Sequence, residues 1–223
     1  GEIMIKGVIF DMDGLMFDTE RLSTEGWLRF SEILGIHMDR EFINSFKGTA
    51  REYSRRLFKE RFGNDFDYDN ARAIRTKYIT DYINENGVPV KKGLYELLEY
   101  LKNENIPCVV CTSTQRELAE KYFEMTEVKK YFSAFVYGDM VERGKPEPDI
   151  FLKGAEMIGV DSCECIVLED SPAGINAGYR AGAKVIAVPD MIPLNNEVLS
   201  KVSFCVGSLE IVRDIIEMYK ETY

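Results

Sequence analysis

The sequence has one histidine, one tryptophan and no surplus of basic residues. Its 28 Lys and Arg stand against 38 Asp and Glu, so the formal net charge over 223 residues is −10. A protein that binds a nucleic-acid backbone needs a basic stripe that releases counterions, and this composition supplies none. We therefore expect no nucleic-acid partner. A small anionic substrate remains compatible, because the local field matters more than net charge there.

Long apolar runs are also absent. No run approaches the length that crosses a bilayer, and no charged-then-apolar segment opens the chain. We expect no membrane partner and a cytoplasmic location. The cysteine count is odd, at five, and most of these residues lie in apolar strand-like runs, which predicts buried reduced thiols. Cys108 and Cys111 have redox or zinc C-x-x-C spacing, but positions three apart on a strand face opposite ways, which favours core packing.

What the sequence does contain is an ordered pattern of strands and helices. Lys6 to Asp11 reads as a buried strand, and residues 19–85 read as several consecutive amphipathic helices. The break Asn86-Gly87-Val88-Pro89 separates that segment from alternating helix and strand patterns. Such alternation predicts right-handed crossovers and a parallel sheet with helices on both faces. The predicted fold is α/β, a doubly wound, Rossmann-like core of residues 1–17 and 88–223 with an inserted α-helical cap of residues 18–87.

The elements expected after the break can be given by range. Strands are predicted over residues 107–111, 134–137, 165–168 and 184–188, and helices over 94–101, 118–123, 149–158, 173–181 and 208–219.

Polar clusters follow several of these strands. Asp11 and Asp13 come after the first strand, Thr112-Ser113-Thr114 after the second, and Glu169-Asp170 after the fourth, while Lys145 lies in a proline-rich loop. Each cluster alone has an ordinary explanation as a turn or helix cap. In a parallel sheet, however, the carboxyl ends of the strands share one edge, so the clusters converge if their strands are neighbours. The carboxylates would then outnumber the single lysine. Oxygen ligands without histidine or cysteine point to Mg²⁺ together with a phosphate.

With these motifs the chain resembles the haloacid dehalogenase (HAD) superfamily, in the β-phosphoglucomutase-like and sugar-phosphate phosphatase branch whose helical cap follows the first motif. The D-x-D-G signature is matched by Asp11-Met12-Asp13-Gly14 and the strand-two hydroxyl by Thr112. Lys145 matches the lysine of G-K-P-x-P-D, and Glu169-Asp170 matches the acidic pair. Each motif is weak, but the ordered set is specific and spans nearly the whole chain.

The resemblance implies a role for each matched residue. Asp11 would be the nucleophile and Asp13 the general acid and base. Mg²⁺ would be held by Asp11, Asp170 and the main-chain carbonyl of Asp13, with Glu169 ordering metal-bound water. Thr112, Ser113 and Lys145 would bind the phosphoryl oxygens. In the cap, Glu20, Lys47, Thr49 and Arg51 would face the leaving group.

A few of these positions also indicate which reaction of the superfamily to expect. Members of the superfamily that act on carbon–halogen bonds lack an acid at the position of Asp13, so Asp13 favours phosphate esters. Residues 47–52 resemble the sugar-phosphate loop of β-phosphoglucomutases, but Ser23 aligns with a histidine of those mutases. We therefore expect a phosphatase for a small phosphorylated metabolite. We also expect the protein to be a monomer. A phosphosugar mutase and a non-catalytic phosphate- or protein-binding relative are the alternatives, and the substrate itself stays open.

Overall fold

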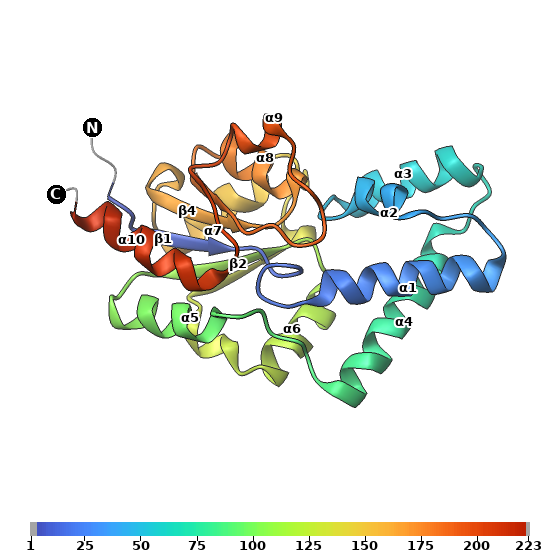
Figure 1. The fold of residues 1–223 in the computed structure, drawn as a ribbon, viewed down its shortest axis with the longest axis horizontal. Coiled ribbons are helices and arrows are strands. Elements are labelled where there is room, and N and C mark those ends of the chain that lie inside the picture. Colours follow the sequence, from blue (N-terminus) through green and yellow to red (C-terminus); the bar gives the residue numbers. More distant parts are fainter. Residues whose placement is uncertain (1–3, 222–223) are drawn as a thin grey trace.

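A parallel six-stranded sheet forms the centre of the molecule (Figure 1). The computed structural model describes residues 4–221. The strand order is β3-β2-β1-β4-β5-β6, so β1 lies between β2 and β4. The strands are β1 (Gly7–Phe10), β2 (Cys108–Thr112), β3 (Ala134–Tyr137), β4 (Cys165–Glu169), β5 (Lys184–Ala187) and β6 (Phe204–Cys205).

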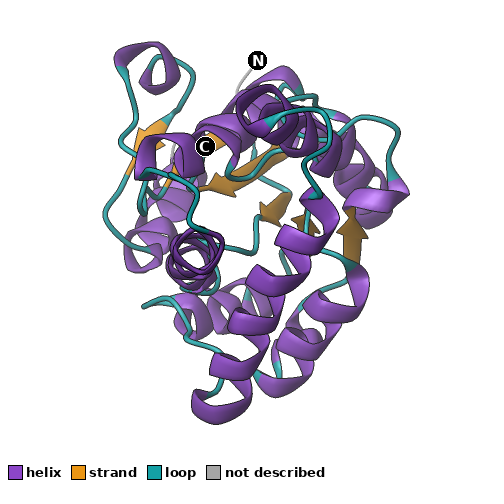
Figure 2. Ribbon diagram, turned by 90° about the vertical axis from the view of Figure 1, so that its right-hand side faces the viewer, coloured by secondary structure: helices purple, strands orange, loops and turns teal. Residues whose placement is uncertain are grey.

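Helices cover both faces of this sheet, which is why the central strands are continuous apolar runs. Val8 and Phe10 pack toward α5, α6 and α10, whereas Ile9 packs toward α7, α8 and α9. Figure 2 shows the strands lying inside a surround of helices. The predicted doubly wound α/β fold is confirmed. The helices are α5 (Leu94–Asn103), α6 (Arg116–Met125), α7 (Asp149–Ile158), α8 (Pro172–Arg180), α9 (Asn196–Leu199) and α10 (Val212–Glu221).

Four further helices lie between β1 and α5 in the sequence and project to one side of the sheet (Figure 1). They are α1 (Thr19–Leu34), α2 (Arg40–Phe46), α3 (Arg51–Phe62) and α4 (Tyr68–Asn86). They enclose an aromatic cluster of their own around Trp27 and Phe58. We propose residues 18–87 as a cap on the sheet-bearing core.

Two connections join the proposed cap to the core, and they lie side by side. The amide of Asp18 donates to the carbonyl of Pro89 at 2.8 Å, and the amide of Lys91 donates to the carbonyl of Met16 at 2.9 Å. The Lys91 ammonium also lies 2.6 Å from Asp190, in the loop after β5. Adjacent, hydrogen-bonded linkers make a compact connection, which we propose as the hinge of cap movement.

Several predicted details were wrong. The closing helix begins at residue 212, after a separate short 3₁₀ helix, and both α9 and β6 went unpredicted because each is very short. Cys108 and Cys111 are buried on opposite faces of β2, as predicted, but Cys163 and Cys205 are exposed. All five thiols are free. The 3₁₀ helices are η1 (Val128–Tyr131), η2 (Gly138–Met140), η3 (Ser162–Glu164) and η4 (Leu209–Ile211).

Among the helices of residues 4–221, none combines the length and the apolar character needed to cross a membrane.

Candidate active site

The turn after β1 brings the first motif against the end of β4. The amide of Asp11 donates to the carbonyl of Leu168 at 3.1 Å. Gly14 has φ of +82°, and a Cβ placed on it would lie 2.2 Å from Oδ2 of Asp170. Only glycine satisfies both the left-handed backbone and this close approach. The turn therefore seats Asp11 and Asp170 side by side.

Lys145 joins two buried carboxylates at this edge. Its Nζ donates to Oδ1 of Asp11 at 2.7 Å and to Oε1 of Glu169 at 2.6 Å, and its side chain is 1% exposed. The second oxygen of Glu169 accepts from the amides of Asp170 and Ser171 and from the Ser171 hydroxyl. Glu169 is therefore fully engaged within the protein, and its direct effect is to fix the Lys145 ammonium beside Asp11.

Negative charge exceeds positive charge at this point. Oxygens of Asp11, Glu169 and Asp170 all lie within 4.8 Å of one another, and the three residues are buried. Burial and the neighbouring Glu169 raise the pKa of Asp11 to about 7. Burial and the charge of Asp11 raise the pKa of Asp170 well above its ordinary value. Three buried carboxylates against one lysine, with oxygen donors alone, fit a hard divalent cation such as Mg²⁺.

This charge surplus predicts how stability depends on pH without metal. Asp11 and Glu20 have ordinary pKa values of 3.8 and 4.5 that the fold raises to about 7 and about 8, mainly through burial. Between about pH 5 and pH 8 these two groups therefore hold more protons in the folded chain than in the unfolded chain, so their contribution to the free energy of unfolding falls as pH rises. We expect thermal unfolding in EDTA to occur at a lower temperature at pH 8 than at pH 5.

Mg²⁺ should counteract the loss of stability at high pH. Because a cation binds the ionised carboxylates, Mg²⁺ should raise the unfolding temperature more at pH 8 than at pH 5. Unfolding temperatures in EDTA that increase from pH 5 to pH 8 would contradict the buried charge surplus.

Asp13 lies across the turn from Asp11 and is held by two hydroxyls. The Thr114 hydroxyl donates to its Oδ2 at 2.5 Å, and the Thr19 hydroxyl donates to Oδ1. Thr19 is the first residue of α1, whereas Thr114 follows β2. Asp13 is thus oriented jointly by the proposed cap and the core. The Thr112 hydroxyl accepts from the Thr114 amide at 3.1 Å, which leaves its proton available to a ligand.

A cavity of about 150 Å³ separates these residues from the helical segment. All but one of the site residues predicted from the sequence line it, and the exception is Glu169, which lies behind Lys145. The predicted residues in the lining are Asp11, Asp13, Glu20, Lys47, Thr49, Arg51, Thr112, Ser113, Lys145 and Asp170. The structure therefore brings together motifs that are widely separated in the chain.

The predicted cap residues differ in what they offer to a ligand. Lys47 is buried, which lowers its pKa, and its Nζ lies 3.7 Å from Sδ of Met191. The Thr49 hydroxyl donates to the carbonyl of Phe46 at 2.7 Å. Arg51 pairs with Asp69 at 2.6 Å. Lys47 thus keeps donor capacity toward the cavity, while Thr49 and Arg51 already have partners in the protein.

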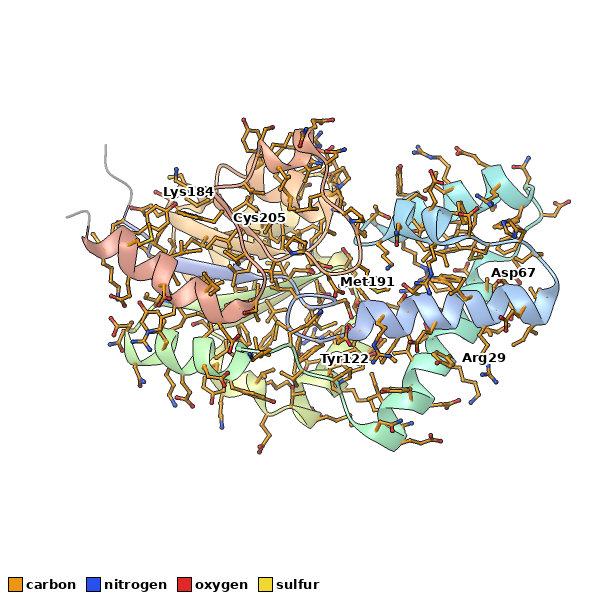
Figure 3. The ribbon with its side chains drawn as sticks, in the orientation of Figure 1. Arg29, Asp67, Tyr122, Lys184, Met191 and Cys205 are labelled. Atoms are coloured by element: carbon orange, nitrogen blue, oxygen red, sulfur yellow. The ribbon has the colours of Figure 1, made fainter. Side chains whose placement is uncertain are left out.

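Sequence reasoning missed the contribution of α4. Arg72, Arg75 and Thr76 line the cavity beside Ile79, and their i, i+3, i+4, i+7 spacing places them on one helix face. That spacing was the available signal. The contact between Met191 and Lys47 was also not predicted, because no local pattern marks it. In Figure 3 Met191 lies where the loop after β5 meets the start of α1, and its Sδ is 3.9 Å from the Thr24 hydroxyl.

The chain matches the haloacid dehalogenase-like hydrolase family over residues 8–188. It is 31% identical to hexitol phosphatase A of Escherichia coli over 205 residues, which cover 92% of each chain. It is 32% identical to β-phosphoglucomutase of Bacillus subtilis over 199 residues, or 85% of this chain and 86% of the relative. The crystal structure of β-phosphoglucomutase from Clostridium difficile is similar with a TM-score of 0.81 and 27% identity, covering 98% of this chain and 99% of that one.

Proposed function

The chain belongs to the haloacid dehalogenase-like hydrolase family, as its motifs predicted, and from that premise we propose a Mg²⁺-dependent phosphatase that hydrolyses a small phosphomonoester, a sugar phosphate or nucleotide-like metabolite, through an aspartyl-phosphate. The observation that carries the proposal is the placement of Asp11. Its buried carboxylate is bonded to Lys145, lines the cavity and lies beside Asp170. Phosphoryl transfer needs this combination of a positioned nucleophile and neutralised charge.

In the proposed reaction, Asp11 attacks phosphorus, and the bond from phosphorus to the leaving oxygen breaks. Asp13 gives a proton to that oxygen, and the carboxylate that remains is held by the hydrogen bonds that the hydroxyls of Thr19 and Thr114 donate to its two oxygens. Asp13 then takes a proton from the water that hydrolyses the phosphorylated Asp11.

Three groups on the core would receive the phosphoryl oxygens, namely the Thr112 hydroxyl, the Ser113 amide and the Lys145 ammonium. Asp11, Asp170 and the main-chain carbonyl of Asp13 would hold Mg²⁺. When bound, the metal supplies positive charge that neutralises the carboxylates and the phosphoryl group. Glu169 keeps Lys145 at the correct place.

Hydrolysis of p-nitrophenyl phosphate tests the proposal. We expect turnover with millimolar Mg²⁺ and its loss in EDTA, restored when Mg²⁺ is added back in excess. A screen of phosphorylated metabolites should then show which ester gives the highest kcat/KM. Absence of turnover across the whole screen would exclude the phosphatase.

A mutase is the second candidate, and the similarity to two β-phosphoglucomutases favours it. Against it, Ser23 lines the cavity where the resemblance to the mutases would place a histidine, and serine has no comparable proton-transfer capacity near neutral pH. Incubation with β-glucose 1-phosphate and a trace of the bisphosphate distinguishes the two. Glucose 6-phosphate as the main product would establish the mutase, whereas inorganic phosphate supports the phosphatase.

A further inference from the structure

The sulfur of Met191 connects the core to the proposed cap. Its Sδ lies 3.7 Å from Nζ of Lys47 and 3.9 Å from the hydroxyl of Thr24, and both of these residues belong to the helical segment 18–87. Figure 3 shows Met191 in the loop after β5, close to the start of α1. Met191 is not part of the lining of the cavity that holds Asp11. The sulfur therefore lies at the junction of core and cap, outside the reaction centre.

Lys47 is a buried lysine without a strong partner. Only 7% of the residue is exposed, and lysines at such depth are normally paired. Among residues 4–221 no carboxylate oxygen lies within 4 Å of its Nζ, and its one hydrogen bond is the contact with Met191. A thioether is a weak acceptor. Because the Thr24 hydroxyl already donates to the carbonyl of Glu20 at 3.0 Å, Lys47 holds the unused donor capacity beside the sulfur.

The chain around Met191 is anchored on both sides. Pro189 and Pro193 restrict the backbone of the loop. The preceding residue, Asp190, accepts from Nζ of Lys91 at 2.6 Å, and Lys91 lies in the second of the two linkers. The sulfur is therefore held against the cap by the loop that carries it.

Access to solvent separates Met191 from the other methionines. Of the nine methionines in the chain, three are buried and five are exposed, whereas Met191 is half-buried. The buried ones are Met12, Met16 and Met38, and the exposed ones are Met4, Met125, Met140, Met157 and Met218. A thioether that an oxidant can reach is converted to a sulfoxide, which is polar. At Met191 a small oxidant can reach the sulfur while the side chain stays packed against the cap.

We propose that Met191 is a modification site, at which hydrogen peroxide oxidises the thioether to the sulfoxide, and that the sulfoxide then fastens the cap to the core. The sulfur attacks one peroxide oxygen, and the O–O bond breaks. The departing oxygen takes a proton from the Lys47 ammonium, and the amine so formed removes the proton from the oxygen now bound to sulfur. The products are the sulfoxide and water. Burial lowers the pKa of Lys47, which makes its ammonium a better proton donor.

Oxidation replaces a weak contact by a strong one. The sulfoxide oxygen lies one bond beyond Sδ, which brings it within reach of the Lys47 ammonium, and a hydrogen bond from an ammonium is charge-assisted. The cap has to move for substrate to enter and product to leave. Oxidation would tie Lys47 to the core loop and hold the cap in place. Resting on the phosphatase function proposed above, we therefore expect oxidation of Met191 to slow turnover.

The test compares oxidised with untreated enzyme. Wild type and Met191→Leu are treated with hydrogen peroxide, catalase removes the peroxide, and dithiothreitol reverses disulfide and sulfenic acid formation at the exposed Cys163 and Cys205. The kcat of the wild type for p-nitrophenyl phosphate with Mg²⁺ should then be lower by about fivefold or more, since a charge-assisted hydrogen bond must break whenever the cap opens. Peroxide should leave kcat of Met191→Leu unchanged. Methionine sulfoxide reductases A and B should restore the wild type.

Two further variants serve as controls. Met125→Leu replaces an exposed methionine on α6, and peroxide should slow it as much as the wild type. Lys47→Leu removes the partner of the sulfoxide, so peroxide should not lower its kcat below that of the untreated variant. Thermal unfolding distinguishes fastening from damage. Oxidised wild type should unfold at a temperature no lower than oxidised Met191→Leu, because the new polar group has a partner in the folded chain.

The outcomes separate the modification site from the proposed function. Peptide mass spectrometry that finds sulfoxide on Met125 but not on Met191, or an equal loss of kcat in wild type and Met191→Leu, overturns the site and leaves the phosphatase intact. An unfolding temperature lower for oxidised wild type than for oxidised Met191→Leu means damage to packing, which also overturns it. Absence of turnover with every phosphomonoester overturns the phosphatase, and the peptide analysis and unfolding temperatures then decide on Met191 alone.

Discussion

Replacement of Asp11 by asparagine is expected to lower kcat for every phosphomonoester by roughly 10⁴-fold or more, because the amide has no nucleophilic oxygen. The fold should survive the change. The amide oxygen still accepts from Lys145, and one of the buried carboxylates that raise each other's pKa is removed. Steady-state and single-turnover kinetics of the purified variant measure the effect, and its unfolding temperature should equal or exceed that of the wild type.

Asp65→Asn is the matched control, since Asp65 is exposed and lies outside the cavity. Its kcat should equal the wild-type value. Activity in Asp11→Asn within tenfold of the wild type would mean that another residue attacks phosphorus, and the proposed roles of Asp11 and Asp13 would both be wrong.

Replacement of Lys145 by methionine should damage stability and catalysis together. The change leaves Asp11 and Glu169 buried without their shared cation, and breaking a buried ion pair by removing one partner typically costs about 3–5 kcal/mol. The variant also loses a donor to the phosphoryl group, so kcat should fall by roughly 10²–10³-fold. Urea unfolding in EDTA measures the first effect, and turnover of p-nitrophenyl phosphate with Mg²⁺ measures the second.

The pH dependence of the stability loss in Lys145→Met identifies its cause. Burial raises the pKa of Asp11 to about 7 in the wild type, and loss of the Lys145 charge, which lowers this pKa, should raise it further in the variant. Protonation of Asp11 then removes part of the uncompensated charge, so the stability deficit should shrink as pH falls from 8 to 5. Lys153→Met removes a half-exposed lysine that pairs with the exposed Glu156 and should cost less than about 1 kcal/mol. A deficit for Lys145→Met as small as that of the control would contradict a buried charge network.

The fold was predictable because its strongest signals are local. The central strands are covered on both faces, so runs such as Val8-Ile9-Phe10 are apolar throughout, and the strand from Ala134 to Tyr137 was predicted with its observed bounds. β6 was missed because a strand of two residues is too short to show an apolar pattern. Cys205 lies on that short edge strand, which is why its thiol is exposed although its neighbours are apolar.

The core half of the site was also predictable, since motif residues at the carboxyl ends of parallel strands must converge once β1 lies between β2 and β4. The cap half was not. Whether Arg75 or Arg51 keeps a free donor depends on tertiary partners, Trp27 and Gly26 in one case and Asp69 in the other. Met191 contacts Lys47 although the two residues lie 144 positions apart in the sequence, and no spacing encodes such a contact.

The central claim is that phosphate passes through Asp11, and rapid-quench labelling tests it most directly. Enzyme and Mg²⁺ are mixed with a substrate labelled in its phosphate, quenched in acid within milliseconds and digested to peptides. The phosphatase proposed here predicts label on the peptide that contains Asp11, released by hydroxylamine as expected of an acyl phosphate and absent from Asp11→Asn. Full turnover without label on that peptide at any time point, or label on a different residue, would contradict it.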